Sequence, residues 1–155
     1  MMKRFQVGLF LLPLTGLLFS APSKADFAKN GNLNVEIDNL RNQKGQVCVS
    51  IYNNSRGFPD DTSRVLQKQC LKVSSIPLMV KFENLKLGSY AAVVMHDEDD
   101  DGTVNQDDLG IPLEGFGFSQ NPEIITSAPQ FGDAAFFVAG ASTDIKIKLI
   151  YMSGS

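Results

Sequence analysis

Residues 82–90 read Phe-Glu-Asn-Leu-Lys-Leu-Gly-Ser-Tyr, and this stretch decides the fold that the sequence predicts. We expect a strand to end at Phe82 and the apolar side chain of Leu85 to plug the turn that follows. Gly88 suits a tight bend because it has no Cβ to restrict the backbone, and Tyr90 then re-enters the sheet. The stretch predicts two strands joined by a compact turn.

Short runs in which apolar residues alternate with polar ones lie on both sides of this turn. Turn-forming residues separate the runs, as is typical of half-buried antiparallel strands. We find no long segment with helical periodicity, although residues 60–69 or 133–138 are compatible with a short helix. The sequence therefore predicts an all-β protein, a single antiparallel β-sandwich. The expected strands cover residues 33–37, 47–51, 65–73, 78–82, 90–96 and 145–151.

The spacing Phe82-x-x-Leu85-x-x-Gly88-x-Tyr90 resembles that of prealbumin-like sandwiches, which are Ig-like in architecture, such as the carboxypeptidase regulatory-like domains. This resemblance covers about a dozen residues. It implies the sandwich fold and carries no activity with it.

A longer resemblance starts at Gly-Ser-Tyr-Ala (88–91) and continues through His-Asp-Glu-Asp-Asp-Asp-Gly (96–102). It includes Leu-Gly-Ile-Pro-Leu-Glu-Gly-Phe-Gly-Phe-Ser (109–119) and Pro-Gln-Phe-Gly-Asp-Ala-Ala-Phe (129–136), and it ends in a final strand through Tyr151. These segments are similar to a bacterial exported family, domain of unknown function 2141. The resemblance implies the fold and export, and it implies no activity.

An acidic segment, residues 97–108, reads Asp-Glu-Asp-Asp-Asp-Gly-Thr-Val-Asn-Gln-Asp-Asp. Oxygen-bearing side chains occupy its first, third, fifth, ninth and twelfth positions, and Gly102 is sixth, where a calcium loop turns sharply. Val104 is the one apolar position, and we expect it to pin the loop against the core. The spacing predicts one Ca²⁺ site of weak extracellular affinity, on the order of 10⁻⁵ to 10⁻³ M. The predicted ligands are Asp97, Asp99, Asp101, the backbone carbonyl of Thr103, Asn105 and Asp108.

The acidic loop is also similar to dockerin and EF-hand calcium loops, but it lacks their helical frame. Residues 90–95 before it are strand-like, and Gly110 and Pro112 forbid a long exiting helix. Asp108 stands where the usual glutamate would bind, and its shorter side chain has less reach. An acidic, solvated turn remains the alternative, because Asp and Asn are ordinary turn residues.

The net charge of −3 is a local property of this loop. Residues 1–25 hold three basic residues and no acid, so the chain without them carries −6, and seven acids lie within residues 97–108. The remainder is close to neutral and has no basic patch, which excludes nucleic acid as an expected partner.

The N-terminus predicts export. Lys3 and Arg4 precede a largely apolar run over residues 5–19, and Ser23 and Ala25 place small residues at a cleavage site. We therefore expect residues 1–25 to be a signal peptide and residues 26–155 to form the β-sandwich domain, periplasmic or secreted. Pro13 and the shortness of the apolar run argue against a membrane anchor, and we expect no transmembrane segment in the mature chain.

Cys48 and Cys70 are the only cysteines. Export would place them where a disulfide persists. Cys48 alternates with the apolar residues of its strand and Cys70 shares a face with lysines, so both lean away from the main core. We expect a cross-strand disulfide on an outer face, worth about 3 kcal/mol from loop closure over the 22-residue separation.

Two further features bear on function. His96 is the only histidine and precedes Asp97, so an envelope hydrolase using this pair is one alternative, although nucleophile and oxyanion roles are not filled. Phe116 and Phe118 alternate with glycines, so a ligand-contact loop for adhesion or assembly is another, with an envelope protein or a glycan as partner. We expect Phe131, Phe136 and Phe137 to belong to the core. The leading prediction is an exported, non-enzymatic protein in which Ca²⁺ stabilises the fold or presents the adjacent loop.

Overall fold

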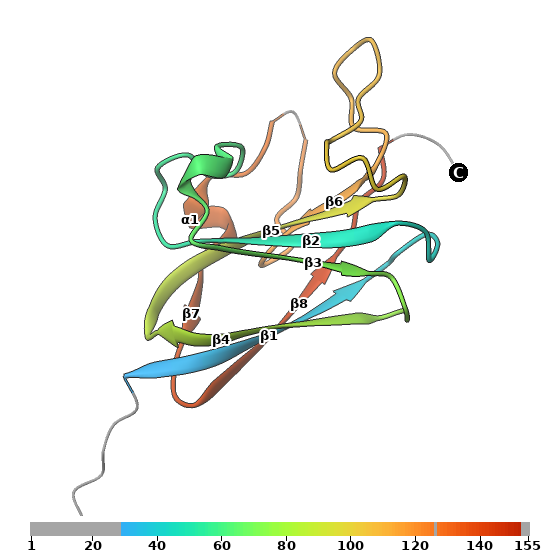
Figure 1. Cartoon of the computed structure of the whole chain (residues 1–155). Coiled ribbons are helices and arrows are strands. Elements are labelled where there is room, and N and C mark those ends of the chain that lie inside the picture. Colours follow the sequence, from blue (N-terminus) through green and yellow to red (C-terminus); the bar gives the residue numbers. More distant parts are fainter. Residues whose placement is uncertain (1–28, 126, 153–155) are drawn as a thin grey trace, which may run out of the picture.

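The computed structural model describes residues 29–125 and 127–152, and the expected signal peptide lies outside these residues. Two β-sheets pack face to face, the larger drawn above the smaller in Figure 1. Strand order is β4-β1-β8 in the three-stranded sheet and β3-β2-β5-β6 in the five-stranded sheet, where β7 also pairs with β5. The prediction of an all-β sandwich is confirmed.

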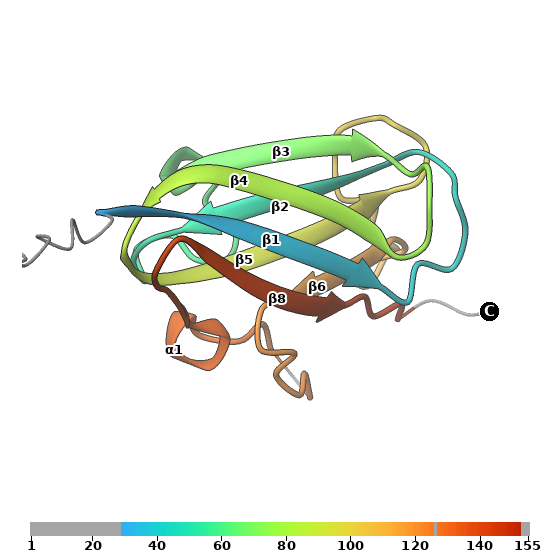
Figure 2. The same cartoon turned by 90° about the horizontal axis from the view of Figure 1, so that it is seen from below.

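The three-stranded sheet is built around β1 (Asn30–Asp38). Strand β4 (Leu78–Lys86) pairs with β1 in antiparallel orientation and β8 (Ser142–Lys148) pairs with it in parallel orientation. Successive side chains of a strand point to opposite faces, so Leu33, Val35 and Ile37 are buried while Asn34 and Glu36 face outward. Figure 2 shows β1 lying between its two partners.

The five-stranded sheet contains β2 (Gln46–Tyr52), β3 (Gln67–Lys72), β5 (Gly88–Asp97), β6 (Gly115–Phe118) and β7 (Phe136–Val138). All of its pairings are antiparallel. A short 3₁₀ helix, η1 (Thr62–Arg64), and one α-helical turn, α1 (Phe131–Ala134), interrupt the connections. Among the described residues, no helix has the length and apolar character needed to cross a membrane.

The main core lies between the sheets. Its members are the inward-facing residues of the strands, with Phe82 and Ile51 among the largest side chains that are fully buried. Removing a side chain as large as Phe82 from such a core costs about 3 to 5 kcal/mol of folding free energy. The alternation in the sequence therefore identified the residues that hold the two sheets together.

The turn at residues 82–90 is tighter than expected because β4 continues to Lys86. The register with β1 shifts, so that Leu33 pairs with Phe82 and Gly31 with Leu85. Leu85 is buried as expected. Gly88 adopts a φ of 157°, which other residues rarely reach, although a Cβ there would meet no neighbour within 4 Å.

A second apolar cluster lies on the outer face of the five-stranded sheet. Phe118 and Ala134 pack there with Phe58 and Phe131, which the connections on either side of the sheet fold over it. Phe131 therefore lies outside the main core, while Phe136 lies within it. Phe137 is 63% exposed, so its assignment to the core was wrong; in β7 it alternates outward between two buried neighbours.

The cysteines are joined as expected. Cys48 and Cys70 face each other in the antiparallel pairing of β2 with β3 and form a disulfide. They lie on the outer face, because Val47 and Val49 on either side of Cys48 point into the main core. No free cysteine is present in the described part of the chain, which holds both cysteines of the sequence.

Candidate metal centre

The acidic loop leaves the sandwich from the end of a central strand. Asp97 is the last residue of β5 and pairs with Gln46 of β2. The chain then forms a long connection and returns at Gly115, where β6 begins. The strand-like approach to the loop is confirmed, and the loop is anchored at both ends to the same sheet.

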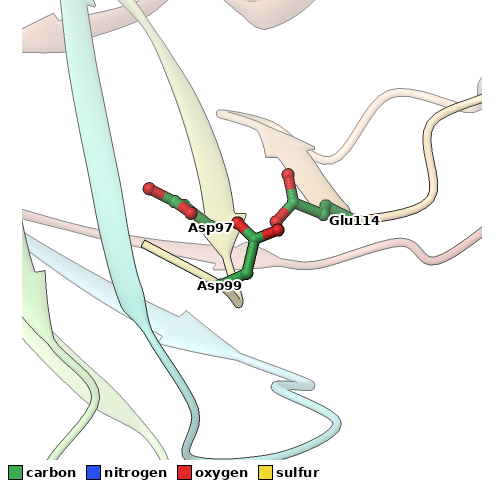
Figure 3. Close-up of side chains that lie close together, drawn as sticks. All are labelled: Asp97, Asp99 and Glu114. Atoms are coloured by element: carbon green, nitrogen blue, oxygen red, sulfur yellow. The ribbon is translucent and has the colours of Figure 1, made fainter. Parts of the chain in front are cut away.

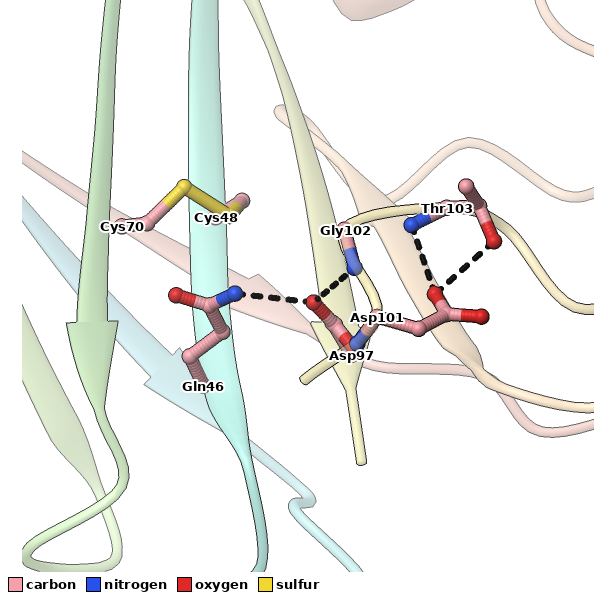
Figure 4. The surroundings of a disulfide bond; sticks show 7 residues. All are labelled: Gln46, Cys48, Cys70, Asp97, Asp101, Gly102 and Thr103. Carbon is pink, nitrogen blue, oxygen red and sulfur yellow. Dashed lines mark hydrogen bonds between the residues drawn. A yellow bond between two sulfur atoms is a disulfide. The ribbon is translucent and has the colours of Figure 1, made fainter. Parts of the chain in front are cut away.

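Asp97 is a buried carboxylate, only 3% exposed, with a full set of donors. The Gln46 amide (2.8 Å) and the Gly102 backbone N–H (3.0 Å) donate to its Oδ2, and the Asp101 N–H (3.2 Å) donates to its Oδ1. Figure 4 shows Gln46 and Gly102 on either side of this carboxylate. Burial raises the pKa of Asp97, but the hydrogen bonds from Gln46 and from the loop backbone outweigh it, and the net pKa is lowered. Asp97 is held as a charged group.

The next part of the loop is a series of side-chain-to-backbone turns. Asp101 Oδ1 accepts hydrogen bonds from the backbone N–H (2.7 Å) and the hydroxyl (2.8 Å) of Thr103, as Figure 4 shows. Gly102 between them has a φ of 79°, the left-handed conformation that glycine reaches without strain. The chain therefore doubles back over the Asp97 carboxylate.

Three carboxylates come together at this point. Ligand atoms of Asp97, Asp99 and Glu114 all lie within 4.8 Å of one another (Figure 3). Glu114 precedes β6 and is only 5% exposed. Its Oε1 accepts from the Glu98 N–H (2.8 Å) and its Oε2 from the Asn105 N–H (3.2 Å), so it ties both halves of the loop to the sheet.

The predicted ligands divide into two groups. Asp97 and Asp99 belong to this cluster, and the Asn105 side-chain amide donates to Asp99 Oδ2 (2.9 Å). Asp101 is turned toward Thr103, whereas Asp108 is exposed and lies outside the cluster formed by the described residues. Glu114 was missed. The signal for it in the sequence was a single acid in the middle of the apolar run 109–119.

Charged and polar neighbours brace the loop from outside the cluster. Arg41 contacts Glu98 (2.6 Å), donates to the Leu113 carbonyl (3.2 Å) and stacks over the Tyr151 ring at 4.6 Å. Burial raises the pKa of Glu98, but hydrogen bonds from Asn42 and Arg41 and the Arg41 charge outweigh it, leaving the pKa lowered. The loop is thus fixed to the segment that connects β1 and β2.

The β3 edge provides a further brace. Lys72, at the end of β3, forms an ion pair with Asp100. Val104 does not pin the loop to the core as expected; its side chain is exposed because the loop turns away from the space between the sheets. Hydrogen bonds to Asp97 and Glu114 hold the loop instead.

His96 is fully buried and has partners on both ring nitrogens. Nε2 lies 2.8 Å from the Lys44 carbonyl oxygen and Nδ1 lies 2.8 Å from the Tyr151 hydroxyl. A carbonyl only accepts, so Nε2 carries a proton, and in the neutral ring Nδ1 accepts from Tyr151. The Ser119 hydroxyl, also buried, donates to the Ala134 carbonyl and accepts from the Ala92 N–H. These contacts account for both side chains as links within the fold.

Phe116 and Phe118 lie on a strand and not on a loop. They form part of β6 and pair with Met95 and Val93 of β5. Gly117 between them packs against β8, where an added Cβ would come within 2.9 Å of the Ile147 side chain and of the Lys148 carbonyl oxygen. The glycines therefore allow close packing, and both rings face outward.

The fold and the site define this protein as an all-β sandwich in which β5 ends at a cluster of three carboxylates, with Asp97 and Glu114 buried and Asp99 exposed. The chain belongs to the family described as "Uncharacterized protein conserved in bacteria (DUF2141)", whose model matches residues 35–146. This match confirms the resemblance drawn from the motifs, and it extends from β1 through the acidic loop to β8. Comparisons with curated proteins and with solved structures found no match.

Proposed function

We propose that this protein is an exported, non-enzymatic β-sandwich that binds one Ca²⁺ at Asp97, Asp99 and Glu114. The observation that carries the proposal is the convergence of these three carboxylates within 4.8 Å. Three negative charges at this separation repel one another unless a cation lies between them. The ion would fasten the long connection between β5 and β6 to the sandwich.

A site made of several protein oxygens favours calcium over magnesium. Calcium binds oxygens at about 2.3 to 2.6 Å, so two ligands on opposite sides of one ion lie about 4.6 to 5.2 Å apart. Magnesium binds at about 2.0 to 2.1 Å and requires a tighter octahedron. Magnesium also gives up its waters reluctantly, so it seldom takes several carboxylates of one protein site as ligands.

Further ligands would come from the same loop. Asn105 already contacts Asp99 through its side chain, and rotation of that amide by 180° would present its oxygen in place of its nitrogen. Asp101 and the Thr103 carbonyl, which lie between Asp99 and Asn105 in the chain, would be the other ligands kept from the predicted set. Asp108 is replaced in this proposal by Glu114, whose longer side chain reaches the cluster from the start of β6.

Two observations support the remaining parts of the proposal. The disulfide between Cys48 and Cys70 supports export, because disulfides persist in oxidising compartments. The buried position of His96, with both ring nitrogens engaged, favours a non-enzymatic protein over a hydrolase that uses His96 and Asp97. A general base must reach the proton that it abstracts.

Calorimetric titration of the mature protein with Ca²⁺, after treatment with a chelator, tests the proposal. We expect one site per chain and a higher melting temperature, with a smaller effect of Mg²⁺ at the same concentration. Absence of both binding heat and thermal shift at millimolar Ca²⁺ would refute the calcium site and leave a solvated acidic turn.

A further inference from the structure

A groove of about 690 Å³ lies on the outer face of the five-stranded sheet. Its floor is formed by β2, β5 and β6, and three connections form its walls. Figure 1 shows these connections rising above the sheet: residues 53–66, the return of the acidic loop at 104–112, and residues 119–125. Pro59, Val104 and Ile124 represent the three walls. The volume is within the range of about 300 to 1,000 Å³ typical of small-molecule sites.

The floor is apolar where an outer sheet face is normally polar. Register places two rows of side chains across it, Cys70–Cys48–Met95–Phe116 and Lys68–Ser50–Val93–Phe118. Val93, Met95 and Phe116 are only half-buried, so the protein itself covers them incompletely. An antiparallel sheet with one solvated face usually presents polar residues there.

The opposite sheet provides an internal comparison. On the outer face of β1 and β8, Lys146 forms ion pairs with Glu36 (2.8 Å) and Asp38 (2.9 Å). Asn34 on the same face donates a hydrogen bond to Asp144 (2.7 Å). The same chain therefore builds one outer face for water and leaves an apolar hollow on the other.

One end of the apolar face is already filled from within. The second apolar cluster, with Phe58 and Phe131 over Phe118, covers that end with the protein's own side chains. The groove is the continuation of this face toward Met95 and Phe116, which the side chains of the described residues leave only half covered. A flexible apolar chain would complete the packing that the cluster begins.

The charged residues at the rim of the groove indicate which charge the polar end of a ligand carries. Lys68 lies at the β3 edge of the groove and makes no ion pair within the part of the chain that the structure describes. The carboxylate of Glu114, which also borders the groove, is engaged by two backbone N–H groups. Asp60 is the other charged group on the rim, and it lies close enough to Tyr52 to raise the pKa of that hydroxyl, after the larger effect of burial.

We propose that this groove binds a single-chain amphiphile with one carboxylate, such as a fatty acid. The apolar chain lies along Val93, Met95 and Phe116, and the carboxylate pairs with Lys68. Binding is of the free monomer and does not require a bilayer. A bound amphiphile would explain why both phenylalanines of β6 face outward, and neither a glycan nor a protein partner is then needed to explain it.

Calorimetric titration with octanoate, decanoate and dodecanoate, each kept below its micellar concentration, tests the proposal. The experiment is done on the mature protein in EGTA, so its result does not depend on the proposed calcium site. Since burial of one methylene is worth about 0.8 kcal/mol, affinity should rise by up to about fourfold for each methylene added. Saturation should occur at one ligand per chain.

Two matched pairs of variants locate the ligand. Met95→Asp places a charge on the floor and should weaken dodecanoate binding at least about tenfold, because an unpaired charge against an apolar chain is unfavourable. Met79→Asp makes the same change at a methionine that is 54% exposed on β4 of the other sheet, and binding should be unchanged. Lys68→Gln should weaken dodecanoate about fivefold and leave dodecanol unaffected. Lys86→Gln, on β4, is its control.

Several results would overturn the proposal. They are the absence of saturable binding to folded protein, an equal effect of the two methionine variants, or tighter binding of dodecylammonium than of dodecanoate. Binding to phosphatidylcholine–phosphatidylglycerol vesicles without binding of the monomer would instead identify a membrane-surface site. Melting curves of each variant establish that it is folded, so a loss of binding reports on the groove.

Discussion

Replacing Glu114 by glutamine tests whether calcium is bound by the folded carboxylate cluster or by the ligands that the linear calcium-loop pattern predicts. The pattern makes Asp108 the twelfth-position ligand, whereas the structure places Glu114 beside Asp97 and Asp99 and leaves Asp108 exposed. We therefore compare Glu114→Gln with Asp108→Asn. Each variant removes one negative charge with almost no change in shape.

The expected magnitude follows from the geometry. The ligand atoms lie within 4.8 Å of one another, and at that upper limit two unit charges repel by about 0.9 kcal/mol in water and about 3.5 kcal/mol at an effective dielectric constant of 20. Neutralising Glu114 relieves two such repulsions. It also weakens the two hydrogen bonds that the backbone N–H groups of Glu98 and Asn105 donate to Glu114, each worth about 1.5 to 3 kcal/mol while the carboxylate is charged. These effects largely cancel. We expect the calcium-free Glu114→Gln protein to melt within about 5 °C of the wild type.

Calcium should reveal the difference. At a hundredfold excess over Kd, binding stabilises the wild type by about 2.7 kcal/mol. For a domain of this size, that corresponds to a rise in melting temperature of about 8 to 13 °C. If loss of one carboxylate weakens binding about tenfold, Glu114→Gln should gain at most about 1.4 kcal/mol at the same calcium concentration. Asp108→Asn should keep the whole shift.

Differential scanning calorimetry of the three proteins, with and without Ca²⁺, measures these shifts. Loss of the shift in Asp108→Asn together with its retention in Glu114→Gln would show that the linear pattern, and not the folded cluster, chooses the ligands. Equal shifts in all three proteins would remove Glu114 from the site.

Three other predictions follow from the fold and the proposed export. Replacing both Cys48 and Cys70 by serine should lower the free energy of unfolding by about 3 kcal/mol in urea titrations, and unchanged stability would contradict the loop-closure argument. The pKa of Glu98 is lowered in the folded state, so its contribution to stability is complete above its unfolded pKa of about 4.5 and is lost as the pH falls below it. The melting temperature should therefore fall between pH 6 and pH 3, and it should fall less in Arg41→Gln than in the wild type. A melting temperature that rises on acidification would contradict the lowered pKa of Glu98. Exported protein should begin at Asp26 in N-terminal sequencing, and an intact N-terminus would exclude the signal peptide.

The strands of the core could be predicted because their two faces differ in chemistry. In β1 and β2, residues at every second position lie in the main core, and the alternation of apolar and polar residues in the sequence predicts this directly. The disulfide followed from the same alternation, which placed Cys48 on the outer face. In β6 the signal fails, since Phe116 and Phe118 point outward and glycines point inward. The pattern is then inverted, and the strand resembles a loop.

The carboxylate cluster shows a different limit. Asp97 and Asp99 are neighbours in the chain, so their spacing could be recognised. Glu114 arrives from the far end of the connection, because β6 pairs with β5 and brings the residue before Gly115 next to the end of β5. Only the pairing of the two strands makes this contact, and spacing within a twelve-residue window does not contain it.

The parallel pairing of β1 with β8 has a consequence for how the chain acquires its fold. Asn32 pairs with Ser142, so the first and last strands of the described chain are partners across most of its length. Bringing two strands so far apart in the chain together has an entropic cost, which opposes the pairing of β1 with β8 until their contacts have formed. During synthesis, the edge of β1 that pairs with β8 should stay unpaired until residues 142–148 have emerged. The domain should therefore remain accessible to proteases and chaperones until the chain is nearly complete, and then close in a late step.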